Sequence, residues 1–391
     1  MNASFDVVIV GGGVTGAAVG DGLAKRGVKT CLVDAVPTFS RASRANMGLI
    51  WCQSKALGCP QFVRWGFASS RAYGNLAAEL KELSGIDTGY APTGGIIPCL
   101  GEAELEARAQ FIEKLRAETE DGTYPASVLS RKELEGMLPK VPFGPEVSGG
   151  IWSDMDGYVD PLHLMFAFRK SFVRLGGTLF AGERVSEVKP SGKGYTVVCG
   201  GRTLECGKAV LAAGLGVRKL AAQLGTDIPV FPNKSQVMLL ERIPADVLPI
   251  PLLGIARTFG GTVMIGAAHE NMGMDRRLTP EVLAANAQWA VRVWPELERK
   301  RIMRFWTGLR VWPKDAYPIY DRIPGHENAF VFAMHSAVSL AAILEQALPD
   351  YVMGKPLPPD GAIFGLSRFA GGGSGFQGSA ASSPHAEAPN K

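Results

Sequence analysis

Apolar residues near the start of the chain fall into two short runs with a segment of small residues between them. Residues 7–10 form a continuous apolar run, which predicts a buried strand, and the segment after it predicts a helix running to about Lys25. A second apolar run, residues 30–33, predicts another strand. Strand, helix and strand in this order predict a βαβ unit with two parallel strands.

Three glycines occupy the junction between the first strand and the helix. Gly11, Gly13 and Gly16 have the spacing of a nucleotide-binding loop. In such a loop the first glycine permits a tight turn, the second leaves room for a pyrophosphate, and the third lets the helix pack closely on the strand. The first helical turn, with Val14 and Thr15, presents backbone N–H groups and a partial positive charge to the phosphates. These residues predict a dinucleotide site.

An acidic residue ends the second strand. Asp34 can accept hydrogen bonds from the hydroxyls of a ribose, and its charge disfavours a 2′-phosphate. The alternative is a βαβ unit that binds no nucleotide, but strand, glycines, helix, strand and acid in this order disfavour it. These residues alone leave the choice between FAD and NAD open.

The rest of the chain lacks the evenly spaced strand–helix repeats that an NAD-dependent dehydrogenase usually shows. The next buried strand of this kind, AVLAAG, comes only far downstream. We therefore predict a nucleotide-binding domain that is interrupted by a substrate or cap domain, and a flexible tail rich in Gly, Ser, Ala and Pro. The predicted nucleotide-binding domain comprises residues 1–90, 151–224 and 307–370, the substrate domain comprises residues 91–150 and 225–306, and the tail comprises residues 371–391.

Composition disfavours several classes of protein. The chain of 391 residues has a formal net charge of +4 with scattered Lys and Arg, which gives little support to a nucleic-acid partner. Its 6 cysteines lie far apart, without a C-x-x-C pair or histidines at metal-binding spacing, so we predict reduced thiols, no metal site and a cytoplasmic protein. Residues 328–344, the longest uncharged run, are too short and too polar to span a bilayer, and the first strand leaves no room for a signal peptide.

Several downstream segments resemble the D-amino-acid oxidase (DAO) superfamily, which includes glycine oxidase, sarcosine oxidase and related amine dehydrogenases. FWTGLRVWPKDAYPIYDRIPGHENAFVFAMHS is similar to the family's G-L-R-P-x-x-x-D-x-x-P block and the strand after it. DGYVDP, VLAAGLG and IPVFPNKSQ provide further matches, and the resemblance covers roughly residues 5–369. It implies an α/β fold in which a Rossmann-like FAD-binding domain of the glutathione-reductase type is interrupted by a substrate domain with an antiparallel or mixed sheet.

The resemblance also implies FAD, held noncovalently, because no histidine or cysteine stands where some sarcosine-oxidising relatives attach flavin. MHSAVSLAA replaces the glycine-rich loop of glycine oxidases, and Tyr320 replaces a usual glycine. HSAVSLA and RANMGLIW look most like flavin subunits of multi-subunit dehydrogenases that act on D-hydroxyproline or on opines such as octopine and nopaline. We therefore expect partner subunits, with a peripheral place at the inner face of the membrane as the alternative to a free cytoplasmic one.

Oxidation of an amino acid by a flavin requires the substrate carboxylate to be anchored. An arginine suits this task, because its planar guanidinium binds a carboxylate through two hydrogen bonds. Arg310, in the matching G-L-R block, is the predicted anchor, and its alternative is a structural arginine paired with Asp315 or Asp321. Arg257, which follows an apolar strand, is a second catalytic candidate with a solvated surface role as its alternative.

His335 and Ser336 are predicted in the loop before the last helix, whose N-terminus would stabilise negative charge on the reduced flavin. His335 is also a catalytic candidate, and its alternative is a structural histidine. Further FAD contacts are expected from the loop after the βαβ unit, the resumed sheet and the last helix. They are Ser43, Arg44, Asn46, Met47, Gly48, Val185, Ala213, Gly214, Gly308, Val338, Ser339 and Leu340.

The sequence therefore predicts an FAD-dependent enzyme that oxidises the C–N bond of a small amino or imino acid by hydride transfer to flavin. D-Hydroxyproline, a proline-like compound and an opine are the expected substrate classes, within a multi-subunit dehydrogenase. A stand-alone oxidase of glycine, sarcosine or D-amino acids that produces hydrogen peroxide is the first alternative. A flavin-bound subunit without catalysis is the second.

Overall fold

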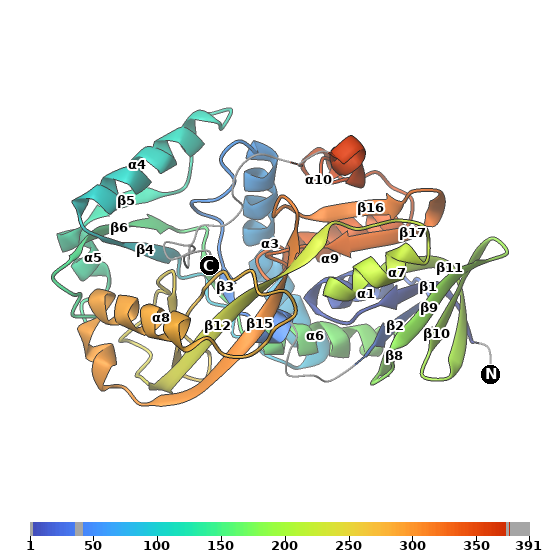
Figure 1. Cartoon of the computed structure of the whole chain (residues 1–391), viewed down its shortest axis with the longest axis horizontal. Helices are drawn as coiled ribbons and strands as arrows, with labels where there is room; N and C mark the ends of the chain where they lie inside the picture. The colour runs from blue at the N-terminus through green and yellow to red at the C-terminus, as the bar shows by residue number, and fades with distance from the viewer. Residues whose placement is uncertain (1–2, 36–41, 373–374, 376–391) are drawn as a thin grey trace.

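The largest sheet contains the predicted βαβ unit in the computed structural model, which describes residues 3–35, 42–372 and 375. β1 (Ala3–Val10) pairs in parallel with β2 (Thr30–Asp34), and α1 (Val14–Lys25) connects them, which confirms the predicted elements. Residues 7–10 of β1 and all of β2 are buried because helices cover the sheet. Its strands follow the order β16 (Ile319–Ile323), β17 (His326–Ala333), β11 (Arg202–Leu211), β1, β2 and β8 (Thr178–Ala181) (Figure 1).

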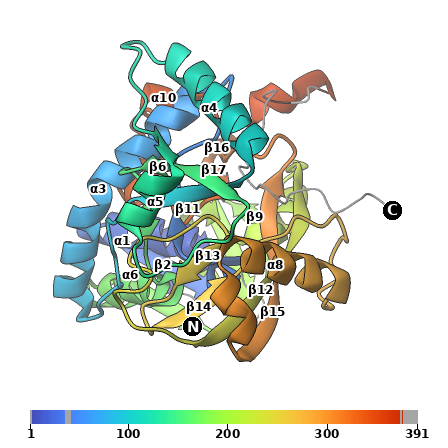
Figure 2. The ribbon, with the colours of Figure 1, turned by 90° about the vertical axis from the view of Figure 1, so that its left-hand side faces the viewer.

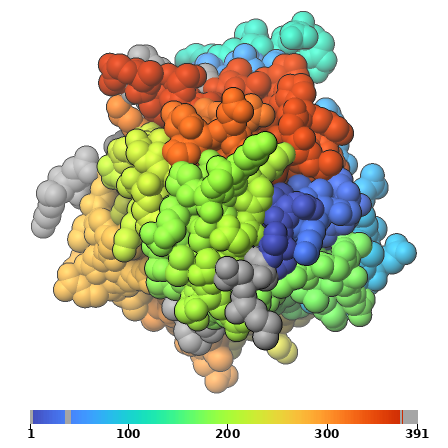
Figure 3. Space-filling model, turned by 90° about the vertical axis from the view of Figure 1, so that its right-hand side faces the viewer, coloured from blue at the N-terminus to red at the C-terminus, as the bar shows by residue number. Residues whose placement is uncertain are grey.

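An antiparallel hairpin extends this sheet at one end of the molecule. β10 (Gly194–Cys199) pairs with β11 and with β9 (Val185–Ser191). Figure 3 views this end, where the hairpin region lies below the C-terminal segments drawn in orange and red. The sheet thus combines strands from three separate parts of the chain, while the predicted domain boundaries stay a prediction.

Helices pack against one face of the large sheet. α1 packs against α6 (Pro161–Arg174) and α9 (Ala341–Val352), and α3 (Pro60–Ser84) packs against both α6 and α9. α6 begins at the predicted Pro161, and Asp160 accepts hydrogen bonds from the first-turn N–H groups of Leu162 and His163. α7 (Val217–Ala222) packs against β11, β17 and β9 on the opposite face, where its Val217 lies in one core cluster with Val8 and Val10 of β1.

Two antiparallel sheets form the other side of the molecule. The larger follows the order β13 (Ile255–Arg257), β14 (Thr262–Ile265), β12 (Val230–Arg242) and β15 (Ile302–Pro313), with the predicted α8 (Pro280–Val293) against it. The smaller follows the order β4 (Gly95–Leu100), β6 (Val147–Ser153) and β5 (Ser127–Ser130). α4 (Glu102–Ala117) and α5 (Arg131–Met137) pack on it, and a capping box starts α5. Figure 2 shows α4, α5 and α8 on this side.

Short elements connect these layers. β3 (Leu49–Ile50) pairs with β7 (Gly157–Tyr158), while α2 (Ala42–Ala45) lies against β15. The remaining elements are α10 (Pro359–Ala362), η1 (Gly214–Gly216), η2 (Pro295–Arg299) and η3 (Leu366–Gly372). Most of the predicted tail lies outside the described residues. Within the described part, no helix has the length and apolar character needed to cross a membrane.

Candidate active site

Gly11 and Gly16 lie where no side chain fits. Gly11 has a φ of +108°, and a Cβ there would overlap the carbonyl oxygen of Ala212, which follows β11. A Cβ on Gly16 would overlap the carbonyl oxygen of Gly11. The glycine loop therefore lies directly against the end of β11, and α1 lies directly against the loop.

The N-terminus of α1 is open to an anion. Gly13 caps the helix without a side-chain hydrogen bond, and the first turn has no acidic residue. Ser43 Oγ accepts a hydrogen bond from Val14 N at 3.1 Å, and a Cβ on Gly13 would come within 3.2 Å of this hydroxyl oxygen. A helix N-terminus bordered by a glycine and a serine hydroxyl fits a pyrophosphate.

Asp34 and Arg169 hold the glycine loop from the side of β2 and α6. Gly12 N donates to Asp34 Oδ2 at 3.0 Å, and Arg169 Nε donates to Gly12 O at 2.9 Å. Arg169 also forms an ion pair with Asp34, whose side chain is only 5% exposed. Arg169 was not anticipated, because nothing in the sequence of α6 relates it to a loop so far away in the chain. Asp34 as a ribose ligand stays a prediction.

A cavity of about 160 Å³ lies between β12, β15, the segment around β3 and the loop before α9. Eight residues predicted from the sequence line it: Asn46, Met47, Gly308, Arg310, His335, Ser336, Val338 and Ser339. The lining also includes side chains that the sequence did not single out, among them Lys55, Ser235, Val237, Leu253 and His269. Cationic, imidazole and apolar groups thus surround one small space.

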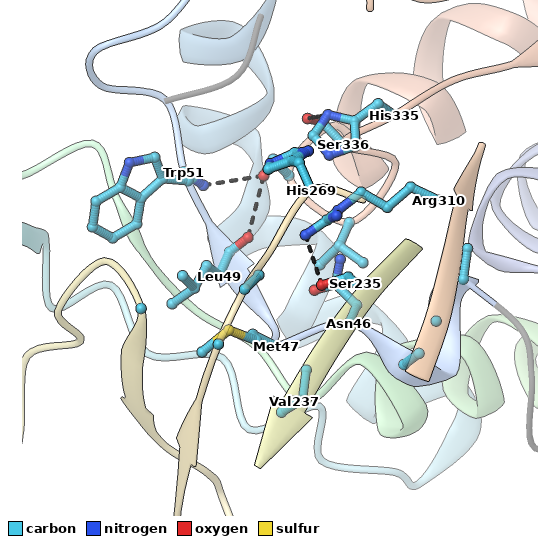
Figure 4. A pocket seen from close by; sticks show the side chains of 18 of the residues that line it. Asn46, Met47, Leu49, Trp51, Ser235, Val237, His269, Arg310, His335 and Ser336 are labelled. Atoms are coloured by element: carbon cyan, nitrogen blue, oxygen red, sulfur yellow. Dashed lines mark hydrogen bonds between the residues drawn. The ribbon is translucent and has the colours of Figure 1, made fainter. Parts of the chain in front are cut away.

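Arg310 is held by neutral oxygens. Its Nη1 donates to Asn233 Oδ1 at 2.9 Å and to Ala268 O at 2.6 Å. Its Nη2 donates to Ser235 Oγ at 2.8 Å, as Figure 4 shows. Among the described residues no carboxylate pairs with it, so the expected alternative of an ion pair with Asp315 or Asp321 is wrong. Burial lowers the pKa of Arg310 to about 10, so the guanidinium is charged at neutral pH. The site therefore contains a half-buried cation that forms no ion pair with a described residue, because Glu270, whose charge acts on Arg310, is paired with Lys234.

The register of the antiparallel pair of β12 and β15 explains why these acceptors surround Arg310. In the antiparallel pair of β12 and β15, Asn233 stands opposite Arg310 and Ser235 stands opposite Gly308. Because side chains alternate along a strand, residues two apart share a face of the sheet. The FPNKSQ segment, which matched a family motif, thus supplies two of the three acceptors that hold Arg310.

Two neutral histidines border the cavity near Arg310. Burial and the charge of Arg310 lower the pKa of His269 to about 3, and they also hold the pKa of His335 well below its usual value. The Trp312 ring contacts both, with ring centroids 5.2 Å from His269 and 4.7 Å from His335. His335 Nδ1 lies 3.0 Å from Ser336 Oγ. His269 was missed because a single histidine after a predicted strand carries no sequence signal.

The loop before α9 is fastened to α3 and β3. Tyr73 donates to Val338 O at 2.8 Å, and Ser69 donates to Ser339 O at 2.8 Å. Ser339 Oγ accepts from Trp51 N at 3.0 Å and donates to Leu49 O at 3.2 Å (Figure 4). These bonds bring the last helix's loop against the segment around β3, where the sequence predicted that both would contact flavin.

The other predicted residues lie around the cavity or farther away. Ser43 and Arg44 belong to α2, and Gly48 and Leu340 adjoin residues of the lining. Arg257 lies outside the described lining, and its Nε donates to Ile243 O at 3.3 Å. Ala213 lies against Gly11, Gly214 follows it, and Val185 begins β9 on the large sheet. Their roles toward a cofactor stay predictions.

Comparison with protein families matches residues 6–344 to DAO, the FAD dependent oxidoreductase family. The chain belongs to this family. It is 33% identical to an opine oxidase subunit of Agrobacterium tumefaciens (strain Ach5), over 93% of this chain and 97% of that protein. It is 27% identical to glycine oxidase of Geobacillus kaustophilus (strain HTA426), over 95% of this chain and 99% of that protein. The crystal structure of the Geobacillus kaustophilus glycine oxidase covers 95% of this chain with a TM-score of 0.86.

The predicted family, fold class and cofactor are confirmed by this membership: the chain is an FAD-dependent oxidoreductase with the DAO-type fold. Its own geometry fits FAD. Gly11 and Gly16 let the loop lie directly against β11 and α1, Gly13 leaves the side of Ser43 clear of a side chain, and the first turn of α1 has no acidic residue, all of which suits a pyrophosphate. α2, the segment around β3 and the loop before α9 would hold the flavin ring beside the cavity.

Proposed function

We propose that this chain oxidises the C–N bond of an amino acid or secondary-amine acid, and that Arg310 anchors the carboxylate of this substrate. FAD, when bound, supplies the acceptor for the hydride. The observation that carries the proposal is a half-buried guanidinium that lines the cavity and whose hydrogen-bond partners, within the described residues, are all neutral oxygens. A substrate carboxylate would supply the missing counterion through a charge-assisted pair.

The charges around the cavity favour the form of the substrate that can react. A hydride leaves the carbon beside an amine only when the nitrogen lone pair is free. Arg310 is charged, while His269 and His335 are neutral, so the site has positive charge and disfavours an ammonium. Apolar side chains, among them Met47 and Leu253, exclude water from the same space.

The carboxylate anchor and the cofactor are tested together in the purified protein. We expect anaerobic addition of amino and imino acids to bleach the flavin of the wild type. Arg310→Met should weaken the apparent affinity for the reducing amine about tenfold or more while FAD content stays unchanged. Reduction at wild-type affinity in Arg310→Met would contradict the proposal. Precipitation with acid should leave FAD in the supernatant, since we propose that it is held noncovalently.

We further propose that the chain works with other subunits. It is similar to a protein that is named as one subunit of an opine oxidase. β15 is an edge strand of the larger antiparallel sheet, and its side chains Met303 and Phe305 are 64% and 37% exposed. The loop that contains Met274, 60% exposed, contacts the same strand, because Thr307 Oγ1 donates to Arg276 O at 2.8 Å. Apolar side chains beside an edge strand suit a protein interface.

Purification of the chain together with the proteins that co-elute with it distinguishes a multi-subunit enzyme from a stand-alone oxidase. We expect a complex that reduces an artificial dye much faster than oxygen, and Met303→Glu should release the partner without loss of FAD. Lys193→Glu, in an exposed turn far from β15 in sequence, is the control for a new surface charge. Rapid peroxide production by a pure monomer would contradict the complex and favour the oxidase.

A further inference from the structure

A buried lysine lines the cavity that contains Arg310. Lys55 is 9% exposed, and its Nζ donates a hydrogen bond to Trp51 O at 3.0 Å. In the described part of the chain, no carboxylate lies within ion-pair distance of this ammonium. A buried ammonium that lacks a counterion is costly. Lys55 therefore has an unused capacity to bind an anion.

Asp156 is the carboxyl group whose charge acts on Lys55, but its oxygens have other partners. Oδ1 accepts from Cys52 N at 2.6 Å and from Gln53 N at 3.3 Å, and Oδ2 accepts from Gln53 Nε2 at 2.8 Å. Burial raises the pKa of Asp156 to about 7 and lowers that of Lys55. Asp156 therefore fixes the backbone beside Lys55 and compensates its charge only in part.

The backbone on both sides of Lys55 has an unusual conformation. Ser54 and Ala56, its neighbours in the chain, have φ values of +53° and +63°. Side chains other than glycine rarely adopt this left-handed region, and such residues concentrate where the surrounding structure fixes a functional group. The strained backbone agrees with a lysine whose side chain is fixed at the cavity wall.

Lys55 and Arg310 are the charged side chains among the described residues of the lining, which includes neither Asp nor Glu. The charges of both cations act on both histidines, and they lower the pKa of His269 and of His335. The four groups therefore share one space. Arg310 and Lys55 are thus the two side chains of the described lining that can carry positive charge, and no carboxylate of the lining opposes them.

We propose that Lys55 binds a second carboxylate of the substrate, so that the preferred substrates of this chain are secondary amines with two carboxylates, one held by Arg310 and the other by Lys55. The inference rests on the proposed function and narrows it. A proline-like acid, with one carboxylate, would leave one buried cation without a counterion. A dicarboxylate compensates both charges at once.

Binding of a non-reacting dianion tests the assignment. Diglycolate has two carboxylates joined through an ether oxygen and no C–N bond to oxidise, and its mono-amide, diglycolamate, replaces one carboxylate with a neutral group of the same shape. Both are titrated into the FAD-containing protein, and the flavin absorbance reports binding. The wild type should bind diglycolate about tenfold or more tightly than diglycolamate, because a charge-assisted pair exceeds a neutral hydrogen bond.

Substitution then assigns the preference to Lys55. Lys55→Met should lose about tenfold or more in affinity for diglycolate, and its affinity for diglycolamate should change by no more than about twofold. Lys193→Met, which removes a lysine charge from an exposed turn, should change neither the affinity for diglycolate nor that for diglycolamate. An equal loss of affinity for diglycolate and diglycolamate in Lys55→Met would overturn the proposal. A changed flavin reduction potential with an unchanged ratio of the two affinities would also overturn it and would assign Lys55 to the flavin.

The ratio of the wild-type affinities for diglycolate and diglycolamate tests the proposal even if Lys55→Met fails to fold or to retain FAD. Equal wild-type affinities for the two ligands, or failure of diglycolate to bind while amines with one carboxylate bleach the flavin, would overturn the Lys55 assignment alone. If no ligand binds and no amine bleaches the flavin, the proposed function fails, and the assignment fails with it.

Discussion

Arg310 and Asn233 face each other across the antiparallel pair of β15 and β12, and the guanidinium donates a hydrogen bond to Asn233 Oδ1 at 2.9 Å. His269 Nδ1 lies 2.9 Å from the same oxygen. Since a guanidinium only donates, Oδ1 is the acceptor, so neutral His269 carries its proton on Nδ1 and has a lone pair on Nε2. One amide group thus orients the proposed carboxylate anchor and fixes the tautomer of the histidine beside it.

Removal of this amide should weaken substrate binding without loss of the cofactor. In Asn233→Leu, one buried N–H of Arg310 and that of His269 lose their acceptor, and we expect the affinity for a carboxylate ligand to fall about tenfold. FAD content should stay unchanged. Flavin absorbance titrations measure both quantities, with Asn75→Leu on the exposed face of α3 as the control. An affinity equal to that of the wild type would show that Arg310 needs no support from Asn233.

The glycine loop was predictable because its chemistry is local. Gly11, Gly13 and Gly16 follow a buried strand and open a helix, and the structure has the strand, the loop and the helix where the pattern predicted them. Short-range patterns record which backbone conformation a segment adopts, so the elements of the fold could be predicted.

The cavity required contacts that no local pattern records. Lys55 lies in an irregular segment, and His269 follows a strand as a single histidine, so neither belongs to a sequence motif. Their proximity to Arg310 depends on how β12, β15 and the segment around β3 come together in space. Arg310 itself was predicted from a family motif, but its neutral partners follow from strand register, which the sequence left open.

Gly308 should be intolerant of a side chain. A Cβ at this position would overlap Cβ of Ala45 in α2, just before the cavity residues Asn46 and Met47. Gly308→Ala should therefore displace α2 and lower the amount of FAD bound per chain, which the ratio of flavin to protein absorbance measures. Gly136→Ala, where a Cβ meets nothing within 4 Å, is the matched control and should retain full FAD. Equal FAD content in both variants would show that α2 adjusts freely.

Lys25 should be essential for the stability of the helices behind the large sheet. Its Nζ lies 3.1 Å from Asp21 Oδ2 and 3.2 Å from Glu345 Oε1, and these side chains are 0% and 7% exposed. Lys25→Met leaves two buried carboxyl groups without their cation, so we expect the free energy of unfolding to fall by about 3–5 kcal/mol.

Urea unfolding of the FAD-containing protein measures this loss. Lys81→Met breaks the pair with Asp87, where the side chains are 63% and 49% exposed, and should cost no more than about 1 kcal/mol. A similar small cost for Lys25→Met would mean that Asp21 and Glu345 are protonated in the folded protein, a state that burial favours because it raises the pKa of both.

The preference for a dianion should decrease as pH rises. Burial lowers the pKa of Lys55, so the ammonium is charged at low pH and loses its charge earlier than an exposed lysine as pH increases. Asp156, with a pKa raised to about 7, loses its proton in the same direction and also makes the site less positive. His269 and His335 are already neutral, and burial holds Cys52 as the thiol.

Diglycolate stays a dianion from about pH 6 to pH 9, since carboxyl groups titrate near pH 4. The wild-type affinity ratio of diglycolate to diglycolamate should therefore fall over this range, and the ratio should change less in Lys55→Met. A wild-type ratio that stays constant would show that neither Lys55 nor Asp156 titrates beside the second carboxylate.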